Sequence, residues 1–380
     1  MKKFLPKFAA SFLLFSTTLY ALLFSTALHA QGATQYPNIT GNVLFQIEAD
    51  RVLSSQKTGV SPNNAFVYIE PNFGLNFNKN WSVKTDWRIQ PNQVLTTRDP
   101  EHPERYRTFL AQNRGVTLDN GLIIEEIKLQ FQNEDMRFVA GKFDPTFGTA
   151  YNKAKRIGVF TSQFAEDYNL REKIGGSMTA LLEKSKITVN SFFNDTTGLS
   201  GSALGNRQKA STRTGIAGST NTLASYSVSM DGKDFFGIED WTYNLGFKSL
   251  SVVRLPGRQR EKGYVFGSEY LYHIGDTAVI PFMEIVKISS LSGEQGRNAT
   301  YTTTALIGKY SSWTGSISYL ARTIKSHQSS EGIKKSDQLQ LSVGYKFTNN
   351  ITLDATRSNM KEDGNKASLL GVLVSYLYQF

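Results

Sequence analysis

The stretch that decides the fold closes the chain, where Leu369 to Phe380 reads L-L-G-V-L-V-S-Y-L-Y-Q-F. Counting back in twos from Phe380 gives only apolar residues: Tyr378, Tyr376, Val374, Val372 and Leu370. The other face is mixed and contains Gln379, Ser375 and Gly371. Side chains of a strand alternate between two faces, and such a pattern over about ten residues is typical of a strand that crosses an outer membrane. The alternative is a buried terminal strand of a soluble β-sandwich.

Aromatic residues gather at the end of this strand, at Tyr376, Tyr378 and Phe380. They fit the aromatic girdle that a membrane barrel places at the lipid interface. A final strand that ends in Phe also resembles the C-terminal signal by which the barrel-assembly machinery of Gram-negative bacteria recognises its clients. The resemblance implies that these three residues serve assembly.

The first thirty residues have the shape of a cleaved secretory signal. Lys2, Lys3 and Lys7 form a charged start, an apolar stretch follows over 8–23, and small residues lead to Ala27 and Ala30. Cleavage is plausible after either alanine. An uncleaved anchor is the alternative, because the apolar stretch is long. We therefore expect a signal peptide at 1–30 and a single barrel domain at 31–380.

Composition narrows the class further. The chain has 380 residues, no Cys and a formal net charge of +10, which falls to +7 once Lys2, Lys3 and Lys7 leave with the signal. A basic balance can indicate nucleic-acid binding, but export argues against it. A channel that attracts anions, or contact with lipopolysaccharide phosphates, fits better. After the signal there is no run of eighteen apolar residues, so no transmembrane helix is expected.

The clearest internal strand is predicted at 81–90. Trp81, Val83, Thr85, Trp87 and Ile89 share one face, and Ser82, Lys84, Asp86, Arg88 and Gln90 share the other. In a soluble sheet the apolar face would turn inward. In a membrane barrel it faces lipid and the charged face lines water, so Lys84, Asp86 and Arg88 are expected in the lumen.

Short and long connections alternate along the chain. Short turns are predicted at 78–80, 133–135, 183–186, 231–240, 274–276, 311–312 and 348–350, of which 231–240 is the longest. Long polar loops are predicted at 50–63, 91–120, 144–173, 195–221, 251–262, 289–298, 324–335 and 359–365. Eight loops and seven turns give about sixteen strands. The predicted fold is an all-β, antiparallel, up-and-down transmembrane barrel with both termini on the short-turn side.

One segment carries a family resemblance. Arg137 to Gly148 reads R-F-V-A-G-K-F-D-P-T-F-G, which resembles the junction between a strand and the third loop of Gram-negative porins, particularly the phosphate-selective branch. The resemblance implies a third loop that folds into the lumen, and a homotrimer. Asp144 stands where that branch often carries Lys, and no dense ladder of Arg and Lys is present. Phosphate selectivity is therefore left open.

The third loop and the wall that faces it hold the candidate site. If the loop folds inward, its fixed charges narrow the lumen and focus the field there. The candidate loop residues are Asp144, Lys153, Lys155, Arg156, Glu166, Asp167 and Arg171. The candidate wall residues are Lys84, Asp86, Arg88, Lys128 and Lys248. The alternative is a solvated outer loop whose charges do nothing specific.

The face of the strand on which each charged residue falls, which we call its parity, also predicts the sign of the ion preference. It places Lys84, Arg88, Lys128, Lys248, Arg322 and Lys346 inward, against fewer acids: Asp86, Glu126, Glu284 and Asp354. The sequence therefore predicts a porin that passes small hydrophilic solutes and weakly prefers anions, without a cofactor. The alternatives are a barrel that serves as a surface antigen or adhesin, and a porin specific for phosphate or another anion.

An enzyme is disfavoured. The four histidines, His29, His102, His273 and His327, lack the spacing of zinc ligands, and no nucleophile or phosphate-loop motif occurs. A fatty-acid transporter needs an N-terminal hatch, but only residues 31–38 precede the first predicted strand at 40–49. The expected partners are outer-membrane lipids with lipopolysaccharide, the assembly machinery and small solutes, with no nucleic acid.

Overall fold

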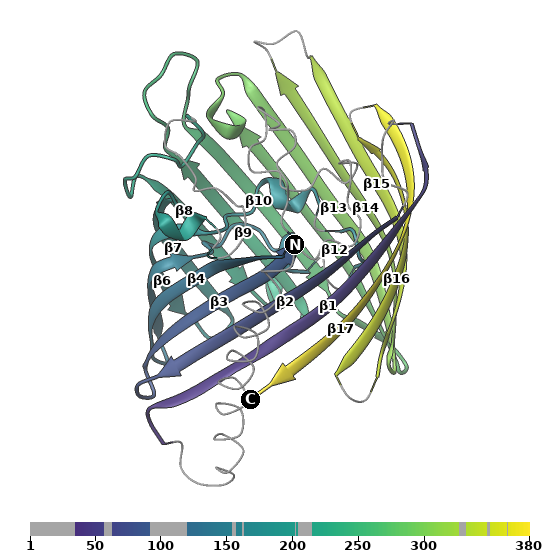
Figure 1. The fold of residues 1–380 in the computed structure, drawn as a ribbon, viewed down its shortest axis with the longest axis horizontal. Coiled ribbons are helices and arrows are strands. Elements are labelled where there is room, and N and C mark those ends of the chain that lie inside the picture. The colour runs from purple at the N-terminus through teal and green to yellow at the C-terminus, as the bar shows by residue number, and fades with distance from the viewer. Residues whose placement is uncertain are drawn as a thin grey trace, which may run out of the picture.

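The computed structural model describes residues 35–56, 63–91, 120–153, 157–161, 163–201, 203, 215–326, 332–347, 350–362 and 364–380. Their strands form one closed antiparallel barrel (Figure 1). The predicted signal at 1–30, with Lys2, Lys3, Lys7, Ala27 and Ala30, lies outside the described residues. Among the residues described, no helix is long and apolar enough to span a bilayer.

The barrel has sixteen strands in chain order, as the sequence predicts. They are β1 (Asn38–Ser55), β2 (Asn63–Asn76), β3 (Trp81–Pro91), β4 (Asn120–Gln132), β5 (Met136–Phe143), β6 (Lys173–Leu181), β7 (Ser185–Asn194), β8 (Ser225–Gly232), β9 (Trp241–Leu250), β10 (Glu261–Tyr270), β11 (Tyr272–Ile274), β12 (Thr277–Ser289), β13 (Arg297–Tyr310), β14 (Trp313–Ser326), β15 (Ile333–Lys346), β16 (Ile351–Glu362) and β17 (Asn365–Gln379). β10 and β11 both pair with β12 and together make one barrel strand, interrupted at Leu271.

The last strand closes the barrel against the first. β17 pairs with β1 from Gln379 opposite Asn42 to Ala367 opposite Ser55. Gly41 and Phe380 exchange two backbone hydrogen bonds, of 3.2 and 3.1 Å. Tyr376 stacks on Phe45 with ring centroids 6.2 Å apart. Closure leaves no open sheet edge, and an open edge could not exist in lipid.

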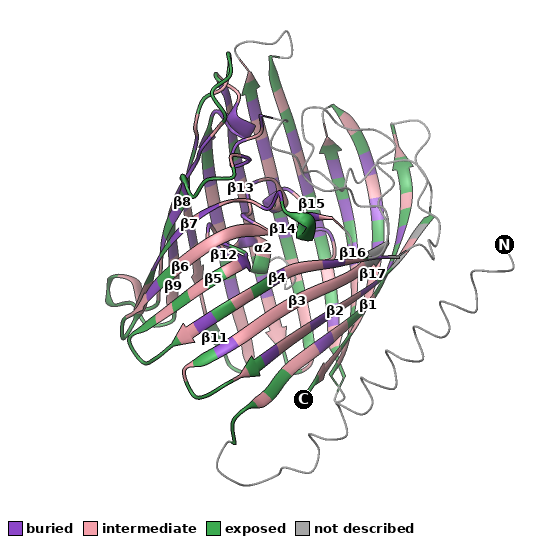
Figure 2. Cartoon of the chain, turned by 60° about the vertical axis from the view of Figure 1, so that its left-hand side comes forward, coloured by how far each residue is buried: buried purple, intermediate pink, exposed green. Residues whose placement is uncertain are grey.

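Alternation of side chains explains why these segments pair as they do. On β1 the outward Phe45 and Ile47 are 40% and 56% exposed, whereas the inward Glu48 and Asp50 are each 7% exposed. Buried and exposed residues therefore alternate along the strands (Figure 2). The polar side points into the lumen, which is the inverse of a soluble sheet.

The short turns predicted at 78–80, 133–135 and 311–312 lie between consecutive strands, whereas the loop predicted at 324–335 is shorter, because β14 and β15 pair as far as Lys325 opposite Ile333. Short turns are fixed by local polar groups: Asn78 Oδ1 accepts from the backbone N–H of Asn80 and Trp81 at 2.9 and 3.0 Å. The long connections gather at the opposite end of the barrel (Figure 1). The prediction of a long loop at 359–365 is wrong, because β16 and β17 stay paired as far as Glu362 opposite Asn365.

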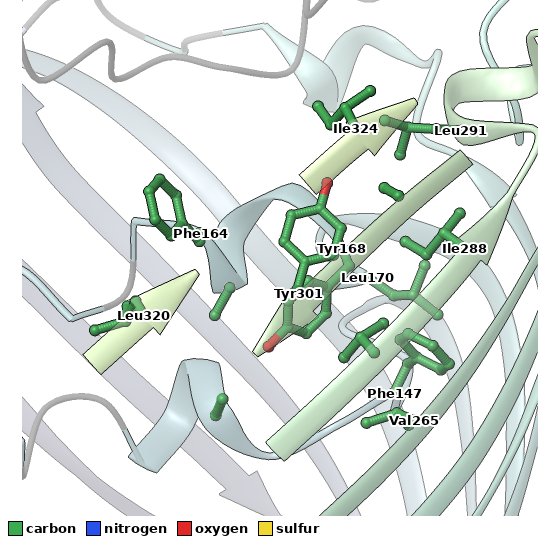
Figure 3. Close-up of a cluster of buried hydrophobic side chains, with 14 of the residues drawn as sticks. Phe147, Phe164, Tyr168, Leu170, Val265, Ile288, Leu291, Tyr301, Leu320 and Ile324 are labelled. Atoms are coloured by element: carbon green, nitrogen blue, oxygen red, sulfur yellow. The ribbon is translucent and has the colours of Figure 1, made fainter. Parts of the chain in front are cut away.

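The main hydrophobic cluster lies inside the barrel, between the third loop and the wall (Figure 3). Loop residues Phe147, Phe164 and Tyr168 pack against inward residues of β10 to β14, such as Val265 and Tyr301. Short helical turns punctuate the loops: α2 (Ala150–Lys153) and η2 (Ala165–Asp167) in the third loop, then η3 (Gly198–Ser200), η5 (Phe235–Gly237) and η6 (Leu291–Gly293). The cluster therefore fastens the third loop within the lumen.

Candidate functional site: the third loop and the charged wall

The third loop, residues 144–172 and called loop 3 from here on, turns inward at the end of β5. β5 is only eight residues long and pairs with β4 only over Ile127–Gln132. Gly141 has a φ of +135° and lies against the backbone of Ile127 and Lys128, so a side chain there would be strained and would collide. This glycine belongs to the R-F-V-A-G-K-F motif, which explains why the motif needs it.

A buried carboxylate on the far wall holds the beginning of loop 3. Glu284 of β12 is 1% exposed, and its oxygens accept from Thr149 N (2.5 Å), Ala150 N (2.9 Å) and the hydroxyl of Tyr168 (2.6 Å). Gly148, with a φ of +78°, allows the backbone to approach this carboxylate. Burial and the nearby Glu284 charge raise the pKa of Tyr168 well above its usual value, so the phenol stays a donor.

Two buried cations bind the remainder of the loop. Lys248 of β9 donates to Tyr168 O at 3.1 Å and pairs with Glu261 at 2.9 Å. Arg322 of β14 pairs with Asp167 at 3.1 Å and with Glu362 at 3.4 Å. Lys248 points inward as predicted, but it lies beneath loop 3 and is 2% exposed. Lys248 and Asp167 therefore hold the loop through buried contacts.

Loop 3 also contacts β14 and β16. The hydroxyl of Ser316 on β14 donates to Ile157 O of the loop, and Val159 N of the loop donates to Thr356 Oγ1 on β16 at 3.0 Å. Phe160 packs with Met360 and Leu369 in a second small cluster. These contacts run from β12 to β17. Loop 3 therefore packs against that part of the wall, and its other side faces β2 to β4.

The wall of β2 to β4 carries a charged cluster, which we call the arginine cluster: Glu70, Arg88, Glu125, Tyr151 and Arg171. Arg88 pairs with Glu70 and with Glu125, both at 3.1 Å. Arg171 of loop 3 pairs with the other oxygen of Glu125 and stacks over Tyr151, 5.4 Å from the ring centroid. The cluster joins the wall to the loop across the lumen and places charges of both signs there.

A β-bulge creates this cluster. Asp86 pairs with Glu126 and Trp87 pairs with Ile124, so Glu125 has no partner on β3. A bulge re-aims the side chain of the extra residue, and Glu125 consequently joins Glu126 on the lumen side. Sequence alternation places these neighbours on opposite faces, so strict parity missed Glu125.

Asp144 lies at the base of the loop. Its backbone N–H donates to Glu126 at 2.8 Å, and its carboxylate accepts from Glu172 N at 2.7 Å. The side chain is exposed to the lumen, yet protein surrounds it. This poor solvation, with the charges of Glu126 and Glu125, raises the pKa of Asp144 to about 7, although Arg171 opposes the rise. Asp144 can therefore change charge near neutral pH.

The other predicted residues fall into three groups. Lys153 pairs with Glu269 at 3.0 Å and lies 5.6 Å from the ring centre of Phe282, while Glu166 is half-buried on η2. Lys84, Asp86 and Lys128 form the second group and face the lumen below the arginine cluster. Lys84 lies opposite Lys128, which pairs with Glu126. The carboxylate of Asp86 accepts a hydrogen bond from Asn72. Lys155 and Arg156 lie outside the described residues.

A recess opens beside these lysines at the short-turn end. Its volume is about 690 Å³, and its lining is mostly polar, including Ser82, Lys84, Gln130 and Gln132. The lumen below loop 3 is therefore hydrophilic, as passage of polar solutes requires.

The register places on the inward face of the strands the charges that alternation assigns there: Lys84, Arg88, Lys128, Lys248, Arg322, Lys346, Asp86, Glu126, Glu284 and Asp354. Acids are not fewer on the inward face, because the register and the ion pairs add charges of both signs there. The added acids are Glu48, Asp50, Glu70, Glu125, Asp231, Glu261, Glu269 and Glu362, and the added cations are Arg137, Lys173, Lys186, Arg297, Lys309 and Lys334. Asp50 and Glu261 lie in segments predicted as loops, at 50–63 and 251–262, whereas Glu48 lies in the strand predicted at 40–49.

Lys142 is a buried cation that the alternation of side chains does not reveal. Its parity on β5 points outward, yet it is 1% exposed. It pairs with Glu172 and Asp195 at 3.0 Å each and donates to Leu199 O at 2.8 Å. Ala203 N also donates to Leu122 O on β4 at 2.8 Å. The fourth loop thus covers the part of β4 that β5 leaves unpaired, and Lys142 ties it to the end of loop 3.

Solved structures share this architecture. OmpF of Salmonella typhi, in a complex with daunomycin, aligns with a TM-score of 0.57 and 11% identity over 90% of this chain and 98% of its own. The fold is that of the outer-membrane porins. The channel DcaP of Acinetobacter baumannii aligns with a TM-score of 0.55 and 10% identity, over 92% and 100% of the two chains. OmpT of Vibrio cholerae, solved in a trimer form, gives 0.51 and 9% over 90% and 100%.

Sequence comparison adds nothing to this result. No family model matches the chain, and no curated protein matches it. At these identities the likeness establishes the fold alone.

Proposed function

We propose that this protein is a porin of the Gram-negative outer membrane, through which small hydrophilic solutes and ions diffuse passively. The observation that carries the proposal is loop 3, which enters a closed barrel and is fastened to its inner wall by the buried Glu284, Lys248 and Arg322. A loop held in this way narrows the lumen without filling the side at β2 to β4. The water path then runs along the arginine cluster.

The charges on that path suit dipolar solutes. Arg88, Glu125 and Arg171 alternate in sign along one line of ion pairs. Fixed charges of both signs, held at a constriction with low-dielectric walls, orient a dipole and impose only a small net barrier on an ion. The net basic chain favours anions, and the additional inward acids reduce this effect. We therefore propose a weak anion preference.

A phosphate-specific porin is the second candidate, through the resemblance at 137–148. A tight phosphate site needs several Arg or Lys side chains with free donors that converge on one point. Arg88 and Arg171 instead already bind carboxylates. Phosphate should therefore block chloride current only weakly, and strong block at low phosphate concentration would favour the specific porin. A closed barrel that serves as an adhesin would conduct nothing.

The export, assembly and location of the protein follow from the same proposal. A cleaved signal at 1–30 would export the chain, Tyr376, Tyr378 and Phe380 would present it to the assembly machinery, and the barrel would insert among lipids and lipopolysaccharide. The trimer form of the similar OmpT supports a homotrimer.

Liposome swelling with uncharged sugars of increasing size tests the diffusion step. Proteoliposomes should swell quickly in a monosaccharide and progressively more slowly in di- and trisaccharides. The matched control is the same folded protein with loop 3 residues 145–170 deleted, which should lose most of this size dependence. Absence of swelling with folded wild-type protein would contradict the proposal.

A further inference from the structure

Six exposed lysines stand on the outward face of the barrel, at the end that bears the long loops. They are Lys262 on β10, Lys287 on β12, Lys325 on β14, Lys335 on β15, Lys361 on β16 and Lys366 on β17. Each lies within two residues of the end of its strand. Within the part of the chain that the structure describes, none of the six forms a salt bridge. We call this set the lysine rim.

The lysines come in close pairs. Ser289 lies opposite Lys262 and two residues from Lys287, so Lys262 and Lys287 are diagonal neighbours. Lys325 and Lys335 have the same relation, because Lys335 faces Thr323. Diagonal neighbours are about 7–8 Å apart.

The third pair is closer still. Lys361 and Lys366 face each other directly across β16 and β17, and Asp337 lies on the other side of Lys361. Like charges placed opposite each other destabilise a sheet, and an anion bound between two lysines of a pair would relieve the repulsion.

The height of the lysine rim matches the headgroup level. On β14 the outward residues pass from Trp313 through the exposed Ile317 and Tyr319 to Thr323 and Lys325. Lys325 lies twelve residues from Trp313, which corresponds to about 30 Å of height at a rise of about 3.3 Å per residue and a tilt of about 40°. The apolar band of such barrels is about 25 Å tall. The ammonium groups therefore lie just beyond the hydrocarbon.

Some of the neighbouring outward residues are also polar. Thr300 lies opposite Lys287, and Thr302 follows on the same face of β13. The hydroxyl of Thr300 can donate to a phosphate or sugar oxygen beside Lys287. The surface thus offers both charge and hydrogen bonds to a phosphorylated glycolipid.

The lysine rim covers only half of the barrel. Outward cations described on β1 to β9 are Arg51, next to β17, and Lys142, which is buried in its ion pairs. On the β10 to β17 side Arg357 continues the basic surface. A barrel uniformly surrounded by lipid would need no such asymmetry, whereas one that contacts partner subunits through β1 to β9 would.

We propose that the lysine rim binds the phosphate groups of the outer-leaflet glycolipid, as they occur on bisphosphorylated lipid A. This inference rests on the proposed outer-membrane location, but it does not depend on conduction. Each lysine near an anionic lipid surface adds attraction, which salt screens. Lipid A would then lie along β10 to β17 in a fixed orientation, and the half formed by β1 to β9 would be left for contacts between subunits.

Binding of bisphosphorylated lipid A to the purified, folded protein in detergent tests the proposal. The variants replace one pair each: Lys262→Gln with Lys287→Gln, Lys325→Gln with Lys335→Gln, and Lys361→Gln with Lys366→Gln. Each should weaken binding by about thirtyfold at low salt. The control, Lys79→Gln with Lys233→Gln at the short turns, loses the same charge and should bind like the wild type. Dephosphorylated lipid A should bind weakly to all.

Two outcomes would overturn the proposal. One is equal binding of bisphosphorylated lipid A by the wild type and by all three pair variants. The other is displacement of the lipid by millimolar inorganic phosphate, which would mean that the lysine rim is a site for free anions. Conductance measured on the same proteins separates the lipid-binding proposal from the porin proposal. The pair variants should conduct like the wild type whether or not they bind lipid.

Discussion

Glu284→Gln is the substitution that most directly loosens loop 3. The amide oxygen can still accept from the N–H groups of Thr149 and Ala150, which share one carboxylate oxygen, but the NH₂ group then faces the hydroxyl of Tyr168, which donates to the other oxygen. A buried donor left unpaired costs about 1–3 kcal/mol. We take the middle of that range, about 2 kcal/mol, for the Tyr168 hydroxyl. That corresponds to about a thirtyfold larger undocked population of the loop.

Labelling of a single cysteine measures that population. The chain has no Cys, so Ala165→Cys places one thiol on the underside of loop 3, where Ala165 is 0% exposed. In the Glu284→Gln background a maleimide should react about thirtyfold faster, because the reaction follows local opening. Single-channel current through the same variant should become noisier.

The matched control is Asp354→Asn, which removes one inward carboxylate of β16 that makes no hydrogen bond to loop 3 in the described residues. It should leave the labelling rate unchanged. Equal labelling of Ala165→Cys with and without Glu284→Gln, in protein that is fully folded, would refute the assignment of Glu284 as an anchor.

Three further predictions concern assembly, register and pH. Deleting Phe380, which closes the barrel through its hydrogen bonds to Gly41, should lower the outer-membrane level of the protein, and a normal level would contradict its role. Val83→Arg puts a charge on the lipid face, which should destabilise the folded barrel by about 2–4 kcal/mol and block its assembly. Lys84→Glu should fold and change the conductance. A heat-modifiability gel measures folding, and the opposite pattern of folding in the two variants would mean that the register is wrong by one residue. Asp144 loses its charge as the pH falls through about 7, so reversal potentials should shift towards anions, and Asp144→Asn should remove that shift. Because the pKa of Asp144 is raised, the folded protein favours the protonated carboxyl. The contribution of Asp144 to the free energy of unfolding is therefore present at low pH, and it is lost as the pH rises from an ordinary carboxyl pKa to about 7.

The sequence predicted the barrel because alternation is a local property. Strands such as β3 and β17 show their two faces within ten residues, and turn residues such as Asn78 mark the reversals. The number of strands, and the end of the barrel at which both termini lie, follow from counting these strands and turns. Lys84, Asp86 and Arg88 share one face of β3 in its pairing with β4.

The candidate site was predictable only in part, because its geometry depends on non-local contacts. The bulge at Glu125 and the partners Glu70 and Glu284 come from strands far apart in sequence, so no local pattern joins them to loop 3. Lys142 has outward parity and would be assigned to lipid by alternation, yet Glu172 and Asp195 bury it. The end of β16 has the composition of a loop, because Asn, Lys, Glu and Asp dominate it, yet its pairing with β17 continues there.

The most direct test of the central claim is the current through the folded protein in a planar bilayer. A porin narrowed by loop 3 predicts discrete, stable and ohmic conductance steps, with a reversal potential slightly on the anion side under a salt gradient. A preference of this kind should weaken at high salt, because the charges of the lumen are then screened. Folded protein that inserts into the bilayer without producing steps would contradict the account.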